Sequence, residues 1–277
     1  MSSIEKSIGV FDSGMGGLTV LRALKSALPH ESFIYLGDTA RLPYGTKSQE
    51  TVIQYAEKMT QILIQKNIKM LVVACNTATA AALDHLQNHT PNLPIVGVIE
   101  PGAQAAVQAS NQHQYALLAT ETTIASDVYQ KTLRALDPKA EILTQACGLF
   151  VALAEENCIN DAIAAATVKK YLSPLMPQLH KDACIILGCT HFPVLTEAIK
   201  QYGGVDINIV DSATATAQKC AEKLKQLNLQ CSPQHDSTIQ FLVTDNPKRF
   251  QRIGPIFLGH AIAKVTLINL KEACPID

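Results

Sequence analysis

Residues 70–81, MLVVACNTATAA, hold the pattern from which the fold can be worked out. An apolar run over 70–74 predicts a buried strand, Cys75 follows it directly, and a helix-forming segment starts at once. We therefore expect a thiol at the point where a strand becomes a helix. The exposed N–H groups and partial positive charge of a helix N-terminus lower the pKa of a cysteine from about 8.5 toward neutrality, which would make Cys75 a base or a nucleophile.

The same pattern recurs at residues 184–192, CIILGCTHF. Here the apolar run covers residues 184–187, Gly188 and Cys189 follow, and a helical pattern begins at Phe192. A free cysteine is usually a small buried hydrophobe. We expect that role for six of the eight cysteines, namely Cys147, Cys158, Cys184, Cys220, Cys231 and Cys274. Cys75 and Cys189 differ because each comes at the end of an apolar run and precedes polar side chains, which indicates a matched pair of functional thiols.

Length, composition and charge bound the class of protein. The 277 residues, 47% hydrophobic and 17% charged, predict a globular chain of one large or two small domains. Lys and Arg number 23 against 24 Asp and Glu, and this balance argues against a nucleic-acid partner. No stretch approaches the roughly 18–20 apolar residues that span a bilayer, so we expect no membrane partner and a cytoplasmic location. The cysteines are then expected as free thiols, and their spacing fits no metal signature.

Apolar runs alternate with helical patterns along the whole chain, which is typical of an α/β protein with parallel sheets. Strands are expected at 8–11, 32–36, 70–74, 95–99, 115–119, 141–145, 184–187, 206–210 and 238–244. Helices are expected from residue 18 onward, and at 48–66, 76–86, 124–136, 160–176, 213–227 and 247–254. Residues 100–102, Glu-Pro-Gly, should end a strand, and residues 120–123 should form a polar turn.

Two series of strands and helices follow one another, and each contains one strand-end cysteine. We therefore predict an α/β fold of two pseudo-symmetric parallel-sheet domains, residues 1–98 with 211–277 and residues 99–210. Ligands bind at the carboxyl ends of the strands in open α/β sheets. Both cysteines should therefore face one cleft between the domains, and the active site is expected there.

The first strand ends in Asp12, Ser13 and a glycine turn at 14–17. A dinucleotide-binding GxGxxG motif would need a third glycine where Thr19 stands, so nicotinamide binding is disfavoured. Asp12 could simply cap its own turn. Its place at the carboxyl end of a strand favours a role in the site instead. For Asp38 and Arg41, an ion pair within a turn and a role in the site are equally favoured.

Two thiols on opposite walls of a cleft suit the inversion of a carbon centre. One thiolate removes a proton from one face of the carbon, the other thiol delivers a proton to the opposite face, and the roles exchange in the reverse reaction. Asp12 near Cys75 and His191 near Cys189 could set the two pKa values close to the working pH. Asn76, Thr77 and Thr190 could stabilise a substrate carboxylate, cap their helices, or do both. The thiols need no cofactor, and no lysine is marked out for a pyridoxal Schiff base.

Five motifs in order resemble glutamate racemase over nearly the whole chain. They are FDSGMGGLTVL at 11–21, GDTARLPYG at 37–45, ACNTATA at 74–80, GVIEPG at 97–102 and LGCTHFP at 187–193. The resemblance implies a cofactor-independent, two-base racemase that interconverts L- and D-glutamate and supplies D-glutamate for peptidoglycan. It also implies a pseudo-symmetric two-domain α/β fold that usually forms a homodimer.

The matching motifs carry the family's site residues over to this chain. Cys75 and Cys189 would be the acid/base pair, with Asp12, Glu155 and His191 as helpers to the thiols. The resemblance places the substrate among Asp12, Ser13, Tyr44, Gly45, Asn76, Thr77, Thr190 and His191. Residues 147–157 read CGLFVALAEEN where the family usually reads CPLFVPLVEEG, so two prolines and the closing glycine around Glu155 are missing. Phe192 stands where tyrosine is common.

Three rival functions stay open from the sequence. The nearest is a racemase for another acidic amino acid, above all aspartate, and the length of the cleft would decide between the two substrates. A non-catalytic amino-acid sensor on the same scaffold would not need its cysteines. A thiol hydrolase would leave the second cysteine unexplained. The family's activation by a cell-wall precursor accompanies a long N-terminal extension, and without that extension no such activation is expected.

Overall fold

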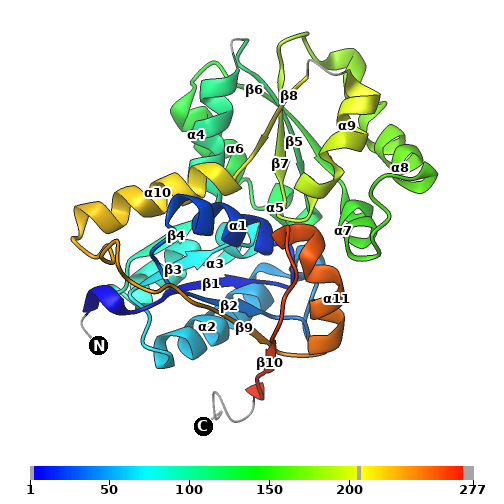
Figure 1. Ribbon diagram of the computed structural model, residues 1–277. Helices are drawn as coiled ribbons and strands as arrows, with labels where there is room; N and C mark the ends of the chain where they lie inside the picture. Colours follow the sequence, from blue (N-terminus) through cyan, green and yellow to red (C-terminus); the bar gives the residue numbers. More distant parts are fainter. Residues whose placement is uncertain (1–2, 111, 205–206, 271–277) are drawn as a thin grey trace.

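Two parallel β-sheets organise the computed structural model, which describes residues 3–110, 112–204 and 207–270 (Figure 1). Within these residues the first sheet has the strand order β10-β9-β2-β1-β3-β4 and the second has the order β6-β5-β7-β8. The first sheet comprises β1 (Ile8–Asp12), β2 (Phe33–Gly37), β3 (Met70–Val73), β4 (Ile95–Gly97), β9 (Ile239–Val243) and β10 (Thr266–Leu267). The second comprises β5 (Gln114–Ala119), β6 (Glu141–Ala146), β7 (Cys184–Gly188) and β8 (Asn208–Asp211).

The two sheets share one topology. In the first sheet, β2 pairs with one edge of β1, and β3 then pairs with the other edge of β1. In the second sheet, β6 and β7 pair with the two edges of β5 in the same way. Cys75 follows β3 and Cys189 follows β7, so the two thiols occupy equivalent positions. Each lies at the point where the strand order reverses, which is where open α/β sheets form their binding crevices. The predicted fold of two pseudo-symmetric parallel-sheet halves is confirmed.

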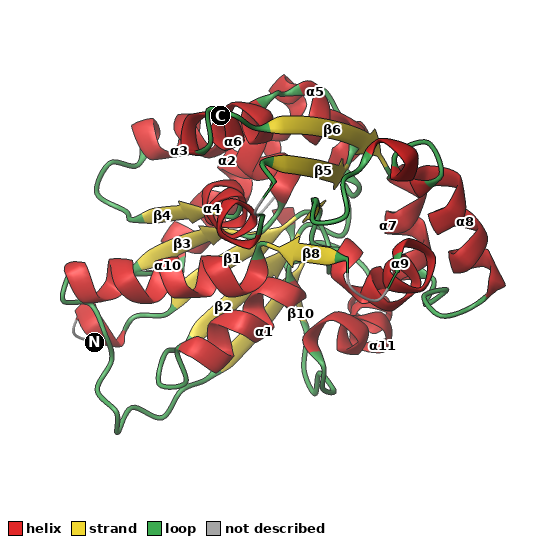
Figure 2. Cartoon of the chain, turned by 90° about the horizontal axis from the view of Figure 1, so that it is seen from above, coloured by secondary structure: helices red, strands yellow, loops and turns green. Residues whose placement is uncertain are grey.

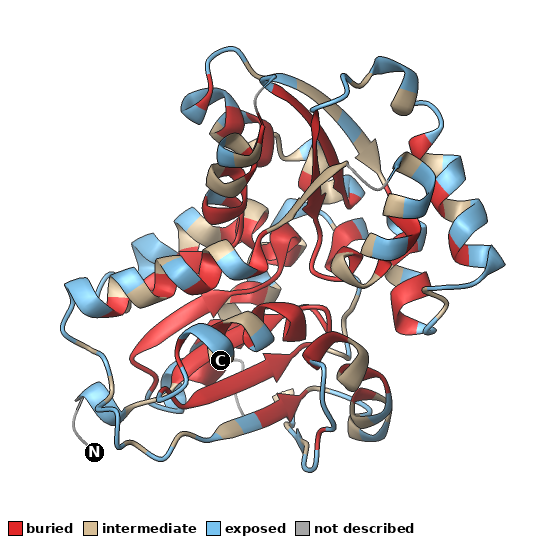
Figure 3. Ribbon diagram, turned by 45° about the horizontal axis from the view of Figure 1, so that its top comes forward, coloured by how far each residue is buried: buried red, intermediate tan, exposed pale blue. Residues whose placement is uncertain are grey.

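Helices cover both faces of each sheet (Figures 1 and 3). On the first sheet, α1 (Leu18–Ala27), α10 (Ala213–Gln226) and α11 (Pro247–Leu258) pack on one face, and α2 (Gln49–Gln65) and α3 (Asn76–His89) pack on the other. On the second sheet, α4 (Ile99–Ala109) and α6 (Val128–Leu136) pack on one face. The opposite face is covered by α7 (Gly148–Glu155), α8 (Ala162–Leu172) and α9 (Thr196–Gly203). Short helices lie at Ser3–Glu5, Tyr44–Thr46, Glu121–Ala125 (α5), Met176–Gln178 and Phe192–Leu195.

The burial of both sheet faces explains the continuous apolar runs of the sequence. Along β3, Met70 and Val72 pack into the core under α1 and α10, whereas Leu71 and Val73 pack into the core under α2 and α3. A strand buried on both faces has no polar alternation. The free cysteines Cys147, Cys184 and Cys220 are buried as expected, and Cys158 and Cys231 are half-buried. The expectation for Cys274 falls outside the described residues.

Several predicted boundaries were wrong. The strand expected at 95–99 ends at Gly97, and Glu100-Pro101-Gly102 lies inside the first turn of α4. Proline is tolerated there because the first N–H groups of a helix have no partner within it. The helix expected at 124–136 is broken into α5 and α6 by Asp127, which has a left-handed backbone (φ 59°). The helix expected at 160–176 ends at Leu172, α11 runs four residues longer than predicted, and β10 was not predicted.

The chain crosses between the sheets twice, after β4 and after β8, and the two crossings lie side by side. Helices α4 and α10 are neighbours (Figure 2), and a Cβ atom placed on Gly102 of α4 would lie 3.0 Å from the Cβ of Ser212, which precedes α10. The domain limits predicted at 98/99 and 210/211 fall beside these crossings, and we propose them as the limits of the two halves. Within the described ranges, each helix is too short or too polar to span a lipid bilayer.

Candidate active site

A small cavity lies where the carboxyl ends of the two sheets meet. It is lined by Ser13, Leu42, Pro43, Tyr44, Gly45, Cys75, Asn76, Thr77, Thr120, Val151, Glu155, Cys189, Thr190 and His191. The structure therefore gathers at one cavity all the predicted site residues except Asp12, which lies fully buried beside it and accepts a hydrogen bond from Thr190 Oγ1 (3.4 Å). The cavity volume is about 20 Å³. A space of this size has room for about one water molecule and not for an amino acid, so the site is closed in this structure.

On one wall, Cys75 caps the N-terminus of α3. Its Sγ accepts a hydrogen bond from the backbone N–H of Ala78 (3.4 Å) and donates one to Ser13 Oγ (3.6 Å). Burial and the negative charge of Asp12 nevertheless raise the pKa of Cys75 to about 12. The predicted lowering of this pKa was therefore wrong for the closed site, because one helix N–H group does not offset the loss of water and a neighbouring carboxylate.

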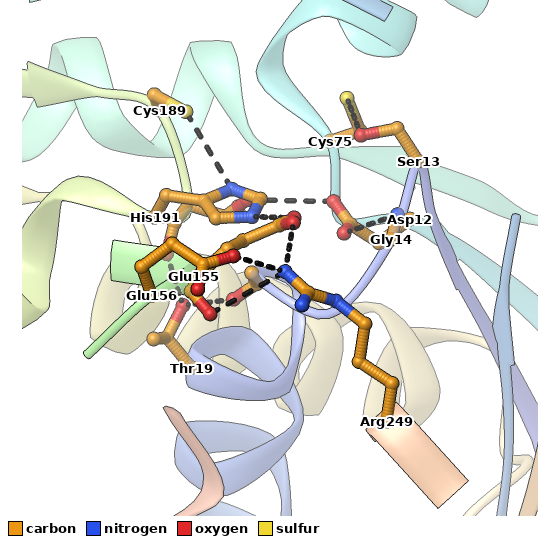
Figure 4. Close-up of polar contacts among 12 residues, drawn as sticks. Asp12, Ser13, Gly14, Thr19, Cys75, Glu155, Glu156, Cys189, His191 and Arg249 are labelled. Atoms are coloured by element: carbon orange, nitrogen blue, oxygen red, sulfur yellow. Dashed lines mark hydrogen bonds and ion pairs between the residues drawn. The ribbon is translucent and has the colours of Figure 1, made fainter. Parts of the chain in front are cut away.

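Asp12 ends β1, directly beneath the Cys75 thiol (Figure 4). Gly14 donates its backbone N–H to Asp12 Oδ2 (2.9 Å). Burial raises the pKa of Asp12, and the positive charge of His191 only partly opposes this shift. Asp12 is thus a carboxyl group that can hold or release a proton next to Cys75.

On the opposite wall, Cys189 follows β7 and faces His191. The Cys189 Sγ lies 3.9 Å from His191 Nδ1, and the other ring nitrogen, Nε2, lies 3.1 Å from Glu155 Oε1 (Figure 4). Burial alone would lower the pKa of His191, but its hydrogen bonds to Cys189 and Glu155 outweigh burial and raise the pKa to about 10. His191 therefore favours the imidazolium form beside the Cys189 sulfur.

Glu155 is the last residue of α7, and a turn that needs a left-handed residue follows it. Asn157 has φ 59° and Cys158 N–H donates to Leu153 O (2.9 Å), which together form the C-terminal cap of the helix. Asparagine tolerates this conformation, so Asn157 replaces the glycine expected from the family pattern. Burial would raise the pKa of Glu155, but hydrogen bonding to His191 and the charges of His191 and Arg249 lower it.

Polar groups that could bind a ligand surround the thiols. Asn76 is buried at the start of α3, and neither atom of its side-chain amide has a hydrogen-bond partner in the described part of the chain. Thr77 Oγ1 lies 2.9 Å from Thr120 Oγ1 across the two halves. Tyr44 is fully buried and donates its hydroxyl to Asp38, and Gly45 O accepts from Thr122 Oγ1 (2.9 Å).

The halves approach closely at the glycine turn after β1. A Cβ atom on Gly16 would lie 2.3 Å from His191 Nδ1 and 2.6 Å from Thr190 Oγ1, so no side chain fits there. Thr19 Oγ1 also donates to Thr190 O (3.2 Å). The turn that could have been a nucleotide-binding loop is instead packed against the Cys189 loop.

Sequence reasoning missed four lining residues, Leu42, Pro43, Thr120 and Val151. Thr120 directly follows β5, so the strand-end rule that marked Asp12 could have found it. Val151 precedes Glu155 by one helical turn and shares its face of α7.

Asp38 and Arg41 form an ion pair (2.8 Å), which favours the structural role that the sequence left open. Among the residues that the structure describes, no group of three or more His, Cys, Asp or Glu side chains is placed to hold a metal ion.

Comparison with known proteins bears on this arrangement. The family described as Asp/Glu/Hydantoin racemase matches residues 8–220, a range that contains both thiols. The chain belongs to this racemase family. Glutamate racemase from Geobacter metallireducens is 44% identical over 96% of this chain and 97% of its own length. Glutamate racemase from Syntrophus aciditrophicus is 42% identical over 95% and 96%.

Solved structures of the family show the same fold. Glutamate racemase from Francisella tularensis, in complex with D-glutamate, superposes with a TM-score of 0.90 at 33% identity, covering 97% of this chain and 99% of that chain. The RacE1 isoform of glutamate racemase from Bacillus anthracis also has a TM-score of 0.90, at 36% identity, covering 96% and 98%. The family membership implied by the sequence motifs is confirmed.

Proposed function

We propose that this racemase interconverts L- and D-glutamate by moving the α-proton between Cys75 and Cys189. The observation that carries the proposal is that the two thiols, at equivalent strand ends of the two halves, line one cavity. Relatives that match nearly the whole chain are glutamate racemases, and one solved relative holds D-glutamate. These similarities support glutamate as the substrate.

The reaction needs a base on one face of Cα and an acid on the other. One cysteine, as thiolate, takes the α-proton, so that a Cα–H bond breaks and an S–H bond forms. The opposite thiol then gives its proton to the other face of the carbanion, which inverts the centre and leaves that sulfur as thiolate. In the reverse direction the two cysteines exchange roles.

The closed site is prepared asymmetrically for this exchange. His191 favours the imidazolium form, which places a positive charge and a proton donor 3.9 Å from the Cys189 sulfur. Cys75, with a pKa of about 12, keeps its proton. Cys189 deprotonates the enantiomer whose α-proton faces it, and Asp12 is placed to take the Cys75 proton when the opposite enantiomer binds.

The weak acidity of the α-proton requires stabilisation of the charge that develops on the carboxylate. We assign this task to the group that surrounds the thiols, namely Ser13, Tyr44, Gly45, Asn76, Thr77, Thr190 and His191. The buried amide of Asn76 offers a donor and an acceptor at the cavity wall. The proposal uses no cofactor and no metal. We further propose a cytoplasmic homodimer whose D-glutamate serves peptidoglycan synthesis.

The test follows L-glutamate in heavy water with the purified protein and no added pyridoxal phosphate. The expected product is D-glutamate with deuterium at Cα, seen as loss of the α-proton signal and of optical rotation. Cys75→Ser and Cys189→Ser should each slow interconversion by at least about a hundredfold, the usual scale for a lost acid or base. Cys158→Ser is the matched control, since Cys158 is half-buried and outside the cavity lining.

Near-normal turnover in either cysteine variant at the site would refute the pair. The family description covers both aspartate and glutamate. A parallel assay with L-aspartate therefore tests which of the two amino acids is the substrate. Binding of glutamate without any α-proton exchange would instead indicate a sensor.

A further inference from the structure

Arg249 joins the two halves at the active site. It lies in the first turn of α11, in the first half, and its Nη2 donates to Glu155 Oε2 (3.4 Å) and to Glu155 O (3.5 Å) in the second half (Figure 4). The backbone of Arg249 is itself fixed, because its N–H donates to Oδ1 of the N-cap residue Asn246 (3.1 Å). The guanidinium is thus held by one half and reaches the last residue of α7 in the other.

Glu155 divides its two carboxylate oxygens between two partners. Oε2 meets Arg249, and Oε1 lies 3.1 Å from His191 Nε2. A histidine that is held at one ring nitrogen presents the other in a defined direction, and here Nδ1 faces the Cys189 sulfur at 3.9 Å. A continuous line of contacts therefore runs from α11 of the first half to the thiol of the second half.

The same helix also holds the ring of His191. Phe257 lies on α11 about two turns after Arg249, and its ring contacts His191 edge to face, with ring centres 5.3 Å apart at 76°. One face of α11 thus sets the position of both Glu155 and His191. Neither Arg249 nor Phe257 lines the cavity, so α11 acts on the site from behind.

We propose that Arg249 is a positioning residue which, when the halves are closed, locks Glu155 and thereby sets His191 against Cys189. This inference rests on the proposed function. Without Arg249, one oxygen of a buried carboxylate loses its partner, and the side chain regains freedom to rotate away from His191. Because Arg249 and Glu155 come from different halves, their contact forms only when the site is closed. His191 is therefore held against Cys189 only in the closed form.

A set of variants separates this role from bulk effects of charge or packing. Arg249→Met removes the guanidinium and should lower kcat by about tenfold, the scale seen for partners of an oriented imidazole. Arg249→Lys keeps a donor and should recover part of the rate. Glu156→Gln is one control, since Glu156 also meets Arg249 (3.0 Å) but is exposed and leaves Glu155 paired. Lys248→Met, at an exposed neighbour on α11, is the control for charge.

Kinetic isotope effects show whether Arg249 acts on one thiol. With α-deuterated L- and D-glutamate, Arg249→Met should raise the isotope effect on kcat/KM for the enantiomer that Cys189 deprotonates and leave it unraised for the other. A general loss of structure would change both in the same way. In a Glu155→Gln background, Arg249→Met should cost nothing further, because its route to His191 is already broken.

A nitrogen NMR signal of the His191 ring in the substrate-free protein gives a second readout. Arg249→Met should shift or broaden this signal, and Glu156→Gln should leave it unchanged. Three results would each overturn the proposal. They are a His191 signal that Arg249→Met leaves unchanged, an equal change of the isotope effect for both enantiomers, and the same fall in kcat from Arg249→Met in the Glu155→Gln background as in the wild type. Wild-type protein that exchanges no α-proton would refute the proposed function alone, since the ring signal still tests the positioning of His191.

Discussion

At the scale of single residues, the buried amide of Asn76 lowers the free energy of unfolding. Its amide is buried, yet neither Oδ1 nor Nδ2 has a hydrogen-bond partner in the described ranges. A buried polar group without a partner costs roughly 1–3 kcal/mol. In the proposed reaction this cost is offset when the substrate supplies the missing partners of Asn76.

Asn76→Leu should therefore make the empty protein more stable and less active. The side chains have similar shapes, and the apolar one removes the unpaired amide, so we expect the free energy of unfolding to rise by roughly 1 kcal/mol. Glutamate turnover should fall by at least about tenfold, since a charge-stabilising group is lost. Urea unfolding and the heavy-water assay measure the two effects. A variant that is less stable than wild type would contradict the stated cost of the amide.

At the scale of elements, α7 depends on the residue that ends it. Asn157 takes the left-handed conformation after the helix, and the cap that it forms fixes where Glu155 leaves α7. The family pattern has glycine there, and this chain has a residue that can adopt the same backbone. The asparagine therefore provides the left-handed turn that follows Glu155 without a glycine.

Replacement of the exposed Asn157 tests this cap. Asn157→Gly should keep both stability and turnover close to wild type, because glycine adopts φ > 0 without strain. Asn157→Ala should destabilise the protein by about 1 kcal/mol, since a Cβ atom disfavours that backbone conformation. Thermal unfolding and glutamate turnover of the pair provide the comparison. Equal stability of the alanine and glycine variants would show that the cap carries no strain.

At the scale of the whole molecule, the site is closed in this structure. A cavity of about 20 Å³ cannot hold an amino acid, so the site must widen before a substrate enters. The two chain crossings lie together beside Gly102 and Ser212, whereas the contacts of Gly16 with the Cys189 loop lie at the site itself. The molecule can therefore open at the site while the crossings stay in place.

Gly16→Ala should act as a wedge between the halves. Its Cβ would lie 2.3 Å from His191 Nδ1, so full closure is prevented, and we expect kcat to fall by at least about tenfold through misplacement of the imidazole. Gly148→Ala is the control, because no atom lies within 4 Å of a Cβ at that position. Small-angle scattering should show a larger radius of gyration for Gly16→Ala alone. Normal turnover in this variant would mean that catalysis does not require the closed form.

The sequence was sufficient to predict the features that depend on local pattern. Apolar runs marked nearly every strand, because strands covered on both faces contain little but apolar residues. The cysteines at the ends of β3 and β7 could be found from their places between such runs and the helices that follow. Boundaries were less predictable: Pro101 looked like a helix breaker but lies where a helix tolerates proline, and Asp127 interrupts a pattern that read as one helix.

Properties that arise from distant residues were decided by the tertiary structure alone. The pKa of Cys75 is raised to about 12 because packing removes water and brings Asp12 to it, and no local pattern encodes that burial. Arg249 reaches Glu155 across 94 positions of sequence, and nothing around Arg249 in the chain marks it. The amino-acid sequence by itself determined which groups stand at the strand ends. How water is excluded, which charges meet and whether the cavity is open depend on how the two halves pack, because desolvation and Coulomb interactions follow distance in space rather than distance along the chain.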